Sequence, residues 1–193
     1  MMKPVFFLFT IFFFFQTSAQ RVITKKSTIN SSLNEVIVDY FKNFSNAKGD
    51  TLSVMPNFIA FNSKISLPGA LSCTIKKYAL PDTYSWEAFL FETEDYVLAS
   101  EQYKKFFQQL NNGRFTPDGT TPHLLKGKMD VPSEQRTFAS SHLKFDAPAN
   151  VSRLKNFMVD LELTYHLPDW QIRLYLYEKL PDDEIRPGTR SIR

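Results

Sequence analysis

Hydrophobic and polar residues alternate with the two-residue period of a β-strand over two neighbouring stretches near the end of the chain. The first covers residues 157–167 and the second covers residues 170–177, with Pro168 and Asp169 between them. Strict alternation of this kind predicts an antiparallel hairpin with one apolar face and one polar face. This hairpin has the strongest strand pattern in the sequence.

The polar face of this hairpin is the best candidate for a binding surface. With Pro168 and Asp169 at the centre of the turn, Tyr175 is expected opposite Glu162, and Tyr177 opposite Asp160. Tyrosine offers rigid contact area with a polar tip, and arginine offers a forked donor, so both suit recognition. Two alternatives stay open: an ordinary solvated sheet face, or a face covered by helices. The predicted binding residues are Glu162, His166, Arg173, Tyr175 and Tyr177.

Two other stretches have the 3.6-residue period of an amphipathic helix. In the first, Ser32 and Glu35 form the spacing of a capping box, and Gly49 follows the far end. Its apolar stripe consists of Leu33, Val36, Ile37, Tyr40, Phe41 and Phe44. The second is expected to begin near residues 93–95 and to stop at residues 111–113. Its buried face is predicted to hold Tyr96, Ala99, Tyr103, Phe106, Phe107 and Leu110.

Four further strands are predicted at residues 65–75, 84–92, 124–129 and 136–145. In the first of these, Cys73 is expected on the inward side with its apolar neighbours Ile65, Leu67, Leu71 and Ile75. The fold class is therefore α+β: a mostly antiparallel sheet of five or six strands with two amphipathic helices packed on one face. We expect one domain over residues 31–180.

A short sequence occurs twice. Tyr-x-Leu-Pro-Asp stands at residues 78–82 and at residues 165–169, each time at an expected hairpin turn and before a tryptophan. Two α-β-β units, at residues 31–93 and 94–180, would explain the repetition. Convergent turn chemistry would also explain it, because Pro-Asp is a favoured turn pair.

The first nineteen residues have the layout of a secretory signal peptide. Lys3 precedes an apolar run at residues 5–15 that contains seven of the 19 phenylalanines. That run is too short to span a bilayer, which takes about 20 residues, and small residues follow it. We expect cleavage between Ala19 and Gln20, as in Gram-negative bacterial export signals. Residues 20–30 are expected to be a flexible lead-in, and residues 181–193 a loose polar tail.

Composition limits the compartment and the partners. A lipid anchor needs a cysteine directly after the cleavage point, and the only cysteine, Cys73, lies far downstream of it. No lipid anchor is therefore expected, and a periplasmic or secreted protein is predicted. The formal net charge of +3, or +2 without Lys3, comes from interleaved charges. Such a pattern offers no case for binding nucleic acid or an anionic membrane. The expected partner is a protein, peptide or glycan of the cell envelope.

Catalytic and metal-binding motifs are missing from the sequence. No GxSxG, GxxxxGK[ST], GxGxxG or HExxH motif occurs, and the three histidines stand 19 and 24 residues apart. A nucleophilic site could be formed from Ser140, Ser141, His142 and Asp160, but their spacing in the sequence does not by itself indicate one. Asp160 and Glu162 share a strand face about 7 Å apart, a separation found in inverting glycosidases and on solvated strands alike. No cofactor is predicted.

The sequence thus favours a non-catalytic, exported binding module over an enzyme. One alternative is a small exported enzyme or small-molecule carrier with its site between sheet and helices. Another is a structural subunit of an envelope complex.

Overall fold

A computed structural model describes residues 28–147 and 152–179. The predicted signal peptide, its cleavage between Ala19 and Gln20, most of the lead-in and the polar tail lie outside the described residues. Within them, neither long helix is long and apolar enough to cross a membrane.

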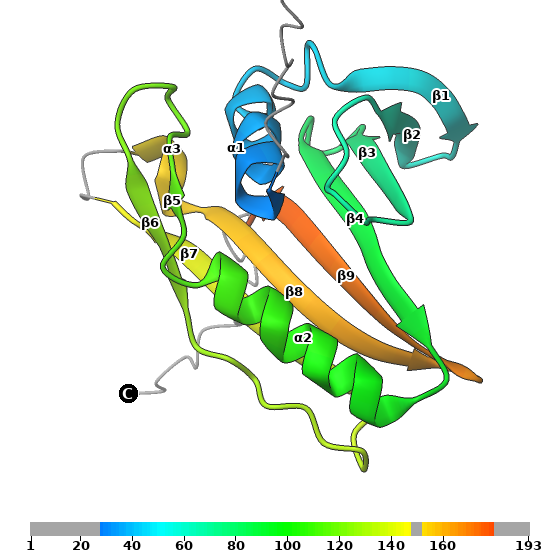
Figure 1. The fold of residues 1–193 in the computed structure, drawn as a ribbon. Coiled ribbons are helices and arrows are strands. Elements are labelled where there is room, and N and C mark those ends of the chain that lie inside the picture. Colours follow the sequence, from blue (N-terminus) through cyan, green and yellow to red (C-terminus); the bar gives the residue numbers. More distant parts are fainter. Residues whose placement is uncertain (1–27, 148–151, 180–193) are drawn as a thin grey trace, which may run out of the picture.

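One antiparallel sheet of nine strands forms the body of the described chain (Figure 1). Its strand order is β1-β2-β3-β4-β9-β8-β7-β6-β5, so the last strand along the chain, β9, lies at the centre beside β4. The α+β class and the antiparallel sheet are confirmed, whereas the predicted count of five or six strands is wrong. The strands are β1 (Lys48–Val54), β2 (Phe58–Ser63), β3 (Ser72–Tyr78), β4 (Tyr84–Thr93), β5 (Arg114–Phe115), β6 (His123–Gly127), β7 (Phe138–Asp146), β8 (Phe157–His166) and β9 (Asp169–Glu178).

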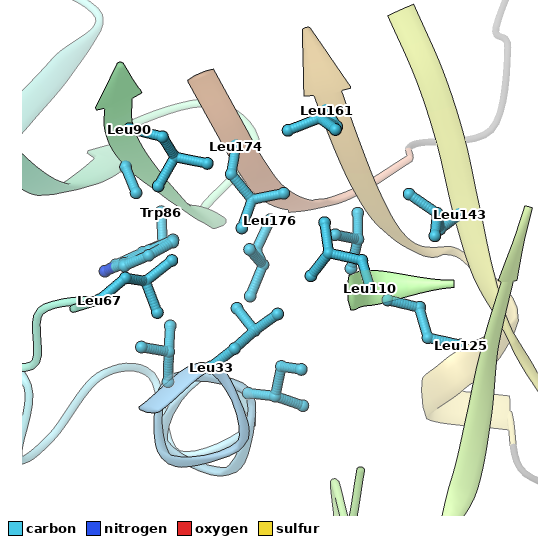
Figure 2. Close-up of a cluster of buried hydrophobic side chains, with 14 of the residues drawn as sticks. Leu33, Leu67, Trp86, Leu90, Leu110, Leu125, Leu143, Leu161, Leu174 and Leu176 are labelled. Carbon is cyan, nitrogen blue, oxygen red and sulfur yellow. The ribbon is translucent and has the colours of Figure 1, made fainter. Parts of the chain in front are cut away.

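Two long helices, α1 (Ile29–Tyr40) and α2 (Tyr96–Leu110), lie across the same face of this sheet (Figure 1). A third, α3 (Ser152–Lys155), is a single short turn before β8. We call the sheet face under α1 and α2 the helix face and the opposite one the open face. The core fills the space between helices and sheet with side chains that are at most a few per cent exposed, among them Leu33, Trp86, Leu110, Leu161 and Leu174 (Figure 2).

Helix α2 begins and ends as its sequence predicts. Asp95 caps it by accepting hydrogen bonds from the backbone N–H groups of Val97 and Leu98, at 2.8 and 3.2 Å. After the C-cap Asn111, Asn112 takes a left-handed φ of 63° and ends the helix.

Helix α1 begins four residues earlier than predicted. Thr28, not Ser32, is its N-cap, and the side chains of Thr28 and Ser31 satisfy one another's backbone N–H groups. Ser32 instead lies buried in the first turn of the helix. The early start also takes residues 28–30 out of the predicted flexible lead-in.

The strands missing from the prediction lie toward the edges of the sheet. β1 is one of the two edge strands and its last five residues are all exposed, so no apolar alternation marks it. Residues 65–71, predicted as strand, instead form a connection between β2 and β3. Leu71 is therefore 60% exposed, while Cys73 on β3 packs against the core and burial raises the pKa of its thiol.

The repeated Tyr-x-Leu-Pro-Asp sequence forms the turns of two hairpins, β3–β4 and β8–β9. Both turns contain a cis proline, at Pro81 and Pro168, and both leave their leucine almost fully exposed. The side chains next to the two turns nevertheless lie on opposite faces of the sheet. Tyr165 and Trp170 pack against the core, whereas Tyr78 and Thr83 line a groove on the other side of the sheet. The division into two α-β-β units stays a prediction.

Candidate functional site

Strands β8 and β9 pair with a register that differs by two residues from the predicted one. Leu167 and Pro168 are the two central residues of the turn, and His166 pairs with Asp169. Glu162 therefore lies opposite Arg173 instead of Tyr175. A shift of two residues keeps every side chain on its predicted face, because the strand period is two.

Three of the five predicted binding residues come together. Glu162, Tyr175 and Tyr177 line one groove on the open face. Arg173 also projects from this face, but its guanidinium binds Glu87 on the neighbouring strand and is not part of the groove lining. His166 lies four residues from Glu162 at the turn, exposed and about 13 Å further along the strand by strand rise. The predicted residues are thus divided into three that line the groove, Arg173 beside it, and His166 at the distant turn.

The groove has a volume of about 420 Å³ and lies where the end of hairpin β3–β4 meets β9 and β8. Strand pairing brings its walls together: Ser85 of β4 lies opposite Tyr177 of β9, which lies opposite Met158 of β8. Its volume is within the range of small binding pockets, although it is open to solvent. The lining consists of Lys76, Tyr78, Leu80, Pro81, Thr83, Tyr84, Ser85, Asp160, Glu162, Tyr175, Tyr177 and Glu178.

Glu87 organises the charges beside the groove. Its carboxylate accepts a hydrogen bond from Lys76 Nζ at 2.9 Å and another from the Arg173 guanidinium. Arg173 also lies over the Phe89 ring, 4.3 Å from its centroid. Burial alone would raise the pKa of Glu87, but its two cationic partners hold it below the usual value. Both cations are therefore committed to contacts within the protein.

Asp160 forms the floor of the groove. It is 4% exposed, and its Oδ2 accepts a hydrogen bond of 2.7 Å from the Tyr177 hydroxyl. Its Oδ1 lies 2.9 Å from Nδ1 of His142 on β7, yet the geometry is not that of a hydrogen bond, and no hydrogen bond from the described residues satisfies this buried oxygen. A buried carboxylate oxygen without a donor is costly.

Glu162 stands beside Asp160 without a partner of its own. Among the described residues, none forms a hydrogen bond or an ion pair with the Glu162 carboxylate, although Arg173 lies opposite it in the register. Partial burial and the negative charge of Asp160 raise its pKa above the usual value. Tyr175 next to it has a pKa of about 12, raised first by burial and then by Glu87 and Glu162.

Several residues of the groove were missed from the sequence. Lys76, Tyr78 and Ser85 come from hairpin β3–β4, which lies next to β9 only because β9 inserts at the centre of the sheet. Glu87 gave one available indication: it is the single charged residue at the centre of an otherwise apolar strand, between Trp86 and Ala88. A charge in such a place requires a partner.

The nucleophilic site that the sequence left open, of Ser140, Ser141, His142 and Asp160, is not assembled in the structure. His142 and Asp160 have the spacing of a base and its orienting acid, and Ser140 lies two residues from His142 on the same strand face. The Ser140 hydroxyl is buried, however, and hydrogen-bonds to no described residue, so the nucleophile–base contact is missing. Ser141 points to the helix face and binds Tyr103 at 2.6 Å. The described residues also contain no group of His, Cys, Asp and Glu able to hold a metal ion.

Comparison of the chain with protein-family models, with curated proteins and with solved structures finds no match. The site is therefore interpreted from its own geometry.

Proposed function

We propose that this protein is an exported, non-catalytic binding module that holds a partner of the cell envelope in the groove on the open face of its sheet. The observation that supports this is the convergence of Glu162, Tyr175 and Tyr177 with Asp160 around one solvent-open groove. Aromatic side chains next to charged groups are typical of recognition surfaces. The predicted signal peptide supports the compartment.

The contrast between the two sides of the sheet supports a site on the open face. Trp86, Leu174 and Leu176 are fully buried within the helix-face core, which leaves that side dedicated to packing. On the open face, partly buried charges and tyrosines surround the groove instead. An enzyme or carrier with its site between sheet and helices would have to open this core.

The proposal is tested by photo-crosslinking from inside and outside the groove. A photoreactive phenylalanine analogue replaces Tyr175 in one variant and His166 in a matched control on the same face. In the full chain, exported from its own N-terminus, we expect a crosslinked partner from position 175 and little or none from position 166. The partner is identified by mass spectrometry, purified, and titrated against the wild type and Tyr175→Ala.

Tyr175→Ala is expected to weaken binding of that purified partner by at least about tenfold, which is the size of a moderate interface contact. Wild-type affinity in a folded Tyr175→Ala variant, or equal crosslinking from both positions, would place the binding surface elsewhere. Mass spectrometry of the same samples reports the mature N-terminus, which we expect at Gln20.

A further inference from the structure

The groove carries more negative than positive charge. Its lining contains three carboxylates, Asp160, Glu162 and Glu178, and one ammonium, Lys76. That ammonium is bound to Glu87, and Arg173 beside the groove is bound to the same carboxylate. The nearby Lys77 forms its own ion pair with Asp82. The cations around the groove are thus already paired, whereas the Glu162 carboxylate has no partner among the described residues and Asp160 accepts a hydrogen bond at only one of its oxygens.

Two of these carboxylates have oxygens that accept no hydrogen bond from the described residues. Asp160 is buried with Oδ1 unsatisfied, and Glu162 is half-buried with no partner among the described residues. Folding brings these two carboxylates close together, and their mutual repulsion lowers stability when both are ionised. Such an arrangement is typical of a site whose partner supplies the missing charge.

Tyrosines complete the surroundings of this charge. Tyr78, Tyr84, Tyr175 and Tyr177 all line the groove. The faces of aromatic rings attract cations, and the attraction grows when the cation loses water. Carboxylates at the floor together with aromatic rings in the walls are the chemistry that recognises an alkylammonium or guanidinium group.

We propose that the groove binds a lysine or arginine side chain presented by a partner polypeptide. This inference rests on the proposed binding function and specifies its ligand. The cationic head lies against the Glu162 carboxylate and donates hydrogen bonds to it, with the negative charge of the buried Asp160 behind it, while the alkyl stem contacts the tyrosine rings.

The rim of the groove favours a polypeptide over a free amine. Leu80 and Pro81 form one side of the opening, and Leu80 is 92% exposed. An exposed leucine beside a polar groove provides apolar contact for residues that flank the bound side chain. The volume of the groove is also larger than one lysine side chain requires, which leaves room for its neighbours.

The experiment is an NMR titration of the isotope-labelled full chain with small probes of defined charge. The cationic probe is Nα-acetyl-lysine N-methylamide, and its uncharged match is Nα-acetyl-norleucine N-methylamide. Chitobiose serves as the glycan probe, and butylamine as the free amine. We expect the lysine derivative to shift resonances of Tyr175, Tyr177 and Asp160 saturably, and to bind more tightly than butylamine. The norleucine derivative should leave them unchanged.

Two variants test whether the charge of Glu162 is needed to bind the lysine derivative. Glu162→Gln keeps the size of the side chain and is expected to weaken the lysine derivative about tenfold, as for the loss of one charged hydrogen bond. His166→Ala, on the same face but outside the groove, should bind the probe like the wild type. The backbone spectrum of each variant confirms that it is folded.

The other possible outcomes would overturn the cationic ligand, the polypeptide source or the binding function. Equal binding of the norleucine derivative, or unchanged affinity in Glu162→Gln, would overturn the cationic ligand. Binding of chitobiose at the groove without binding of the lysine derivative would overturn it as well, while the proposed binding function would stand. Equal affinity for butylamine and the lysine derivative would overturn the polypeptide source. Should no probe bind the groove while the photo-crosslinked partner ignores Tyr175→Ala, both proposals would fall.

Discussion

The two faces of strands β4, β9 and β8 are made by the same three segments of chain and differ in how their side chains are satisfied. On the helix face, Trp86, Leu174 and Leu161 contact other apolar groups, and all are fully buried. On the open face, the neighbours of these residues are Glu87, Tyr175 and Glu162, which are partly buried and carry charges or hydroxyls. One face is complete within the protein, whereas the other has carboxylate oxygens without donors.

This difference shows where stability and function are separated. Packing on the helix face is self-sufficient, so substitutions there should change the free energy of unfolding. In the groove, Glu162 has no partner among the described residues, so its substitution should change binding and leave stability equal or higher.

The largest effect is expected on the helix face. Trp86→Ala removes a fully buried ring whose indole N–H donates to Ser63 Oγ at 3.0 Å. We expect the free energy of unfolding to fall by about 3–5 kcal/mol, the usual cost of such a cavity. Urea denaturation followed by circular dichroism measures it. A loss below about 1 kcal/mol would mean that this core is not tightly packed.

A smaller loss is expected from the open-face ion pairs. Glu87→Gln removes the carboxylate shared by Lys76 and Arg173 and leaves two cations close together. Because hydrogen bonds to charged groups contribute more than neutral ones, the free energy of unfolding should fall by about 2 kcal/mol.

The matched control for Glu87 is an ion pair at the surface. Asp82→Asn breaks the exposed contact with Lys77 and should cost less than about 1 kcal/mol. Equal losses in the two variants, measured by urea denaturation at low ionic strength, would show that the Glu87 network is no stronger than a surface pair.

The smallest expected effect is a gain in the free energy of unfolding, from Glu162→Gln. Glu162 has a raised pKa in the folded state, so the folded protein holds this proton more tightly than the unfolded chain does. Stability associated with Glu162 is therefore present below its unfolded pKa and is lost as the pH rises through its folded pKa. Glu162→Gln should raise the free energy of unfolding at pH 7 by less than about 1 kcal/mol, because solvent screens a half-exposed group.

The pH dependence identifies the cause of that gain. Denaturation at pH 7 and at pH 4 should show the advantage of Glu162→Gln fading at the lower pH, because the raised pKa favours the neutral form of the wild-type side chain as the pH falls. The surrounding groups that titrate or carry charge are Asp160, His142, Glu87, Arg173 and Tyr175. A variant less stable than the wild type at pH 7 would mean that Glu162 has a stabilising partner.

The parts of the fold predicted correctly have regular burial. Burial alternates along β9 and in the second half of β8, and α2 has a cap, an apolar stripe and a stop. β1 has none of these, because an exposed edge strand is defined by its partner and not by its own pattern. The strand order could not be predicted from the sequence either, because β9 lies beside β4 through long-range packing.

The sequence predicted on which face of the sheet the candidate site residues lie, but not which residues they contact. Alternation fixed the side of the sheet for Tyr175, Tyr177 and Glu162, and the two-residue error in register left that side unchanged. The role of Arg173 depended on Glu87, which comes from a strand far away in sequence. Pairing within one hairpin could be reasoned from the turn, whereas contacts between hairpins required the fold.

The most direct test of the account is the pKa of the Glu162 carboxyl, measured by carbon-detected NMR with and without saturating Nα-acetyl-lysine N-methylamide. We predict a value above the ordinary 4.5 in the free protein and a lower value with the probe bound, because a cation stabilises the ionised form. A value at or below 4.5 that the probe does not change would show that the Glu162 carboxylate is already satisfied, and would contradict the account of the groove as a site that awaits a cation.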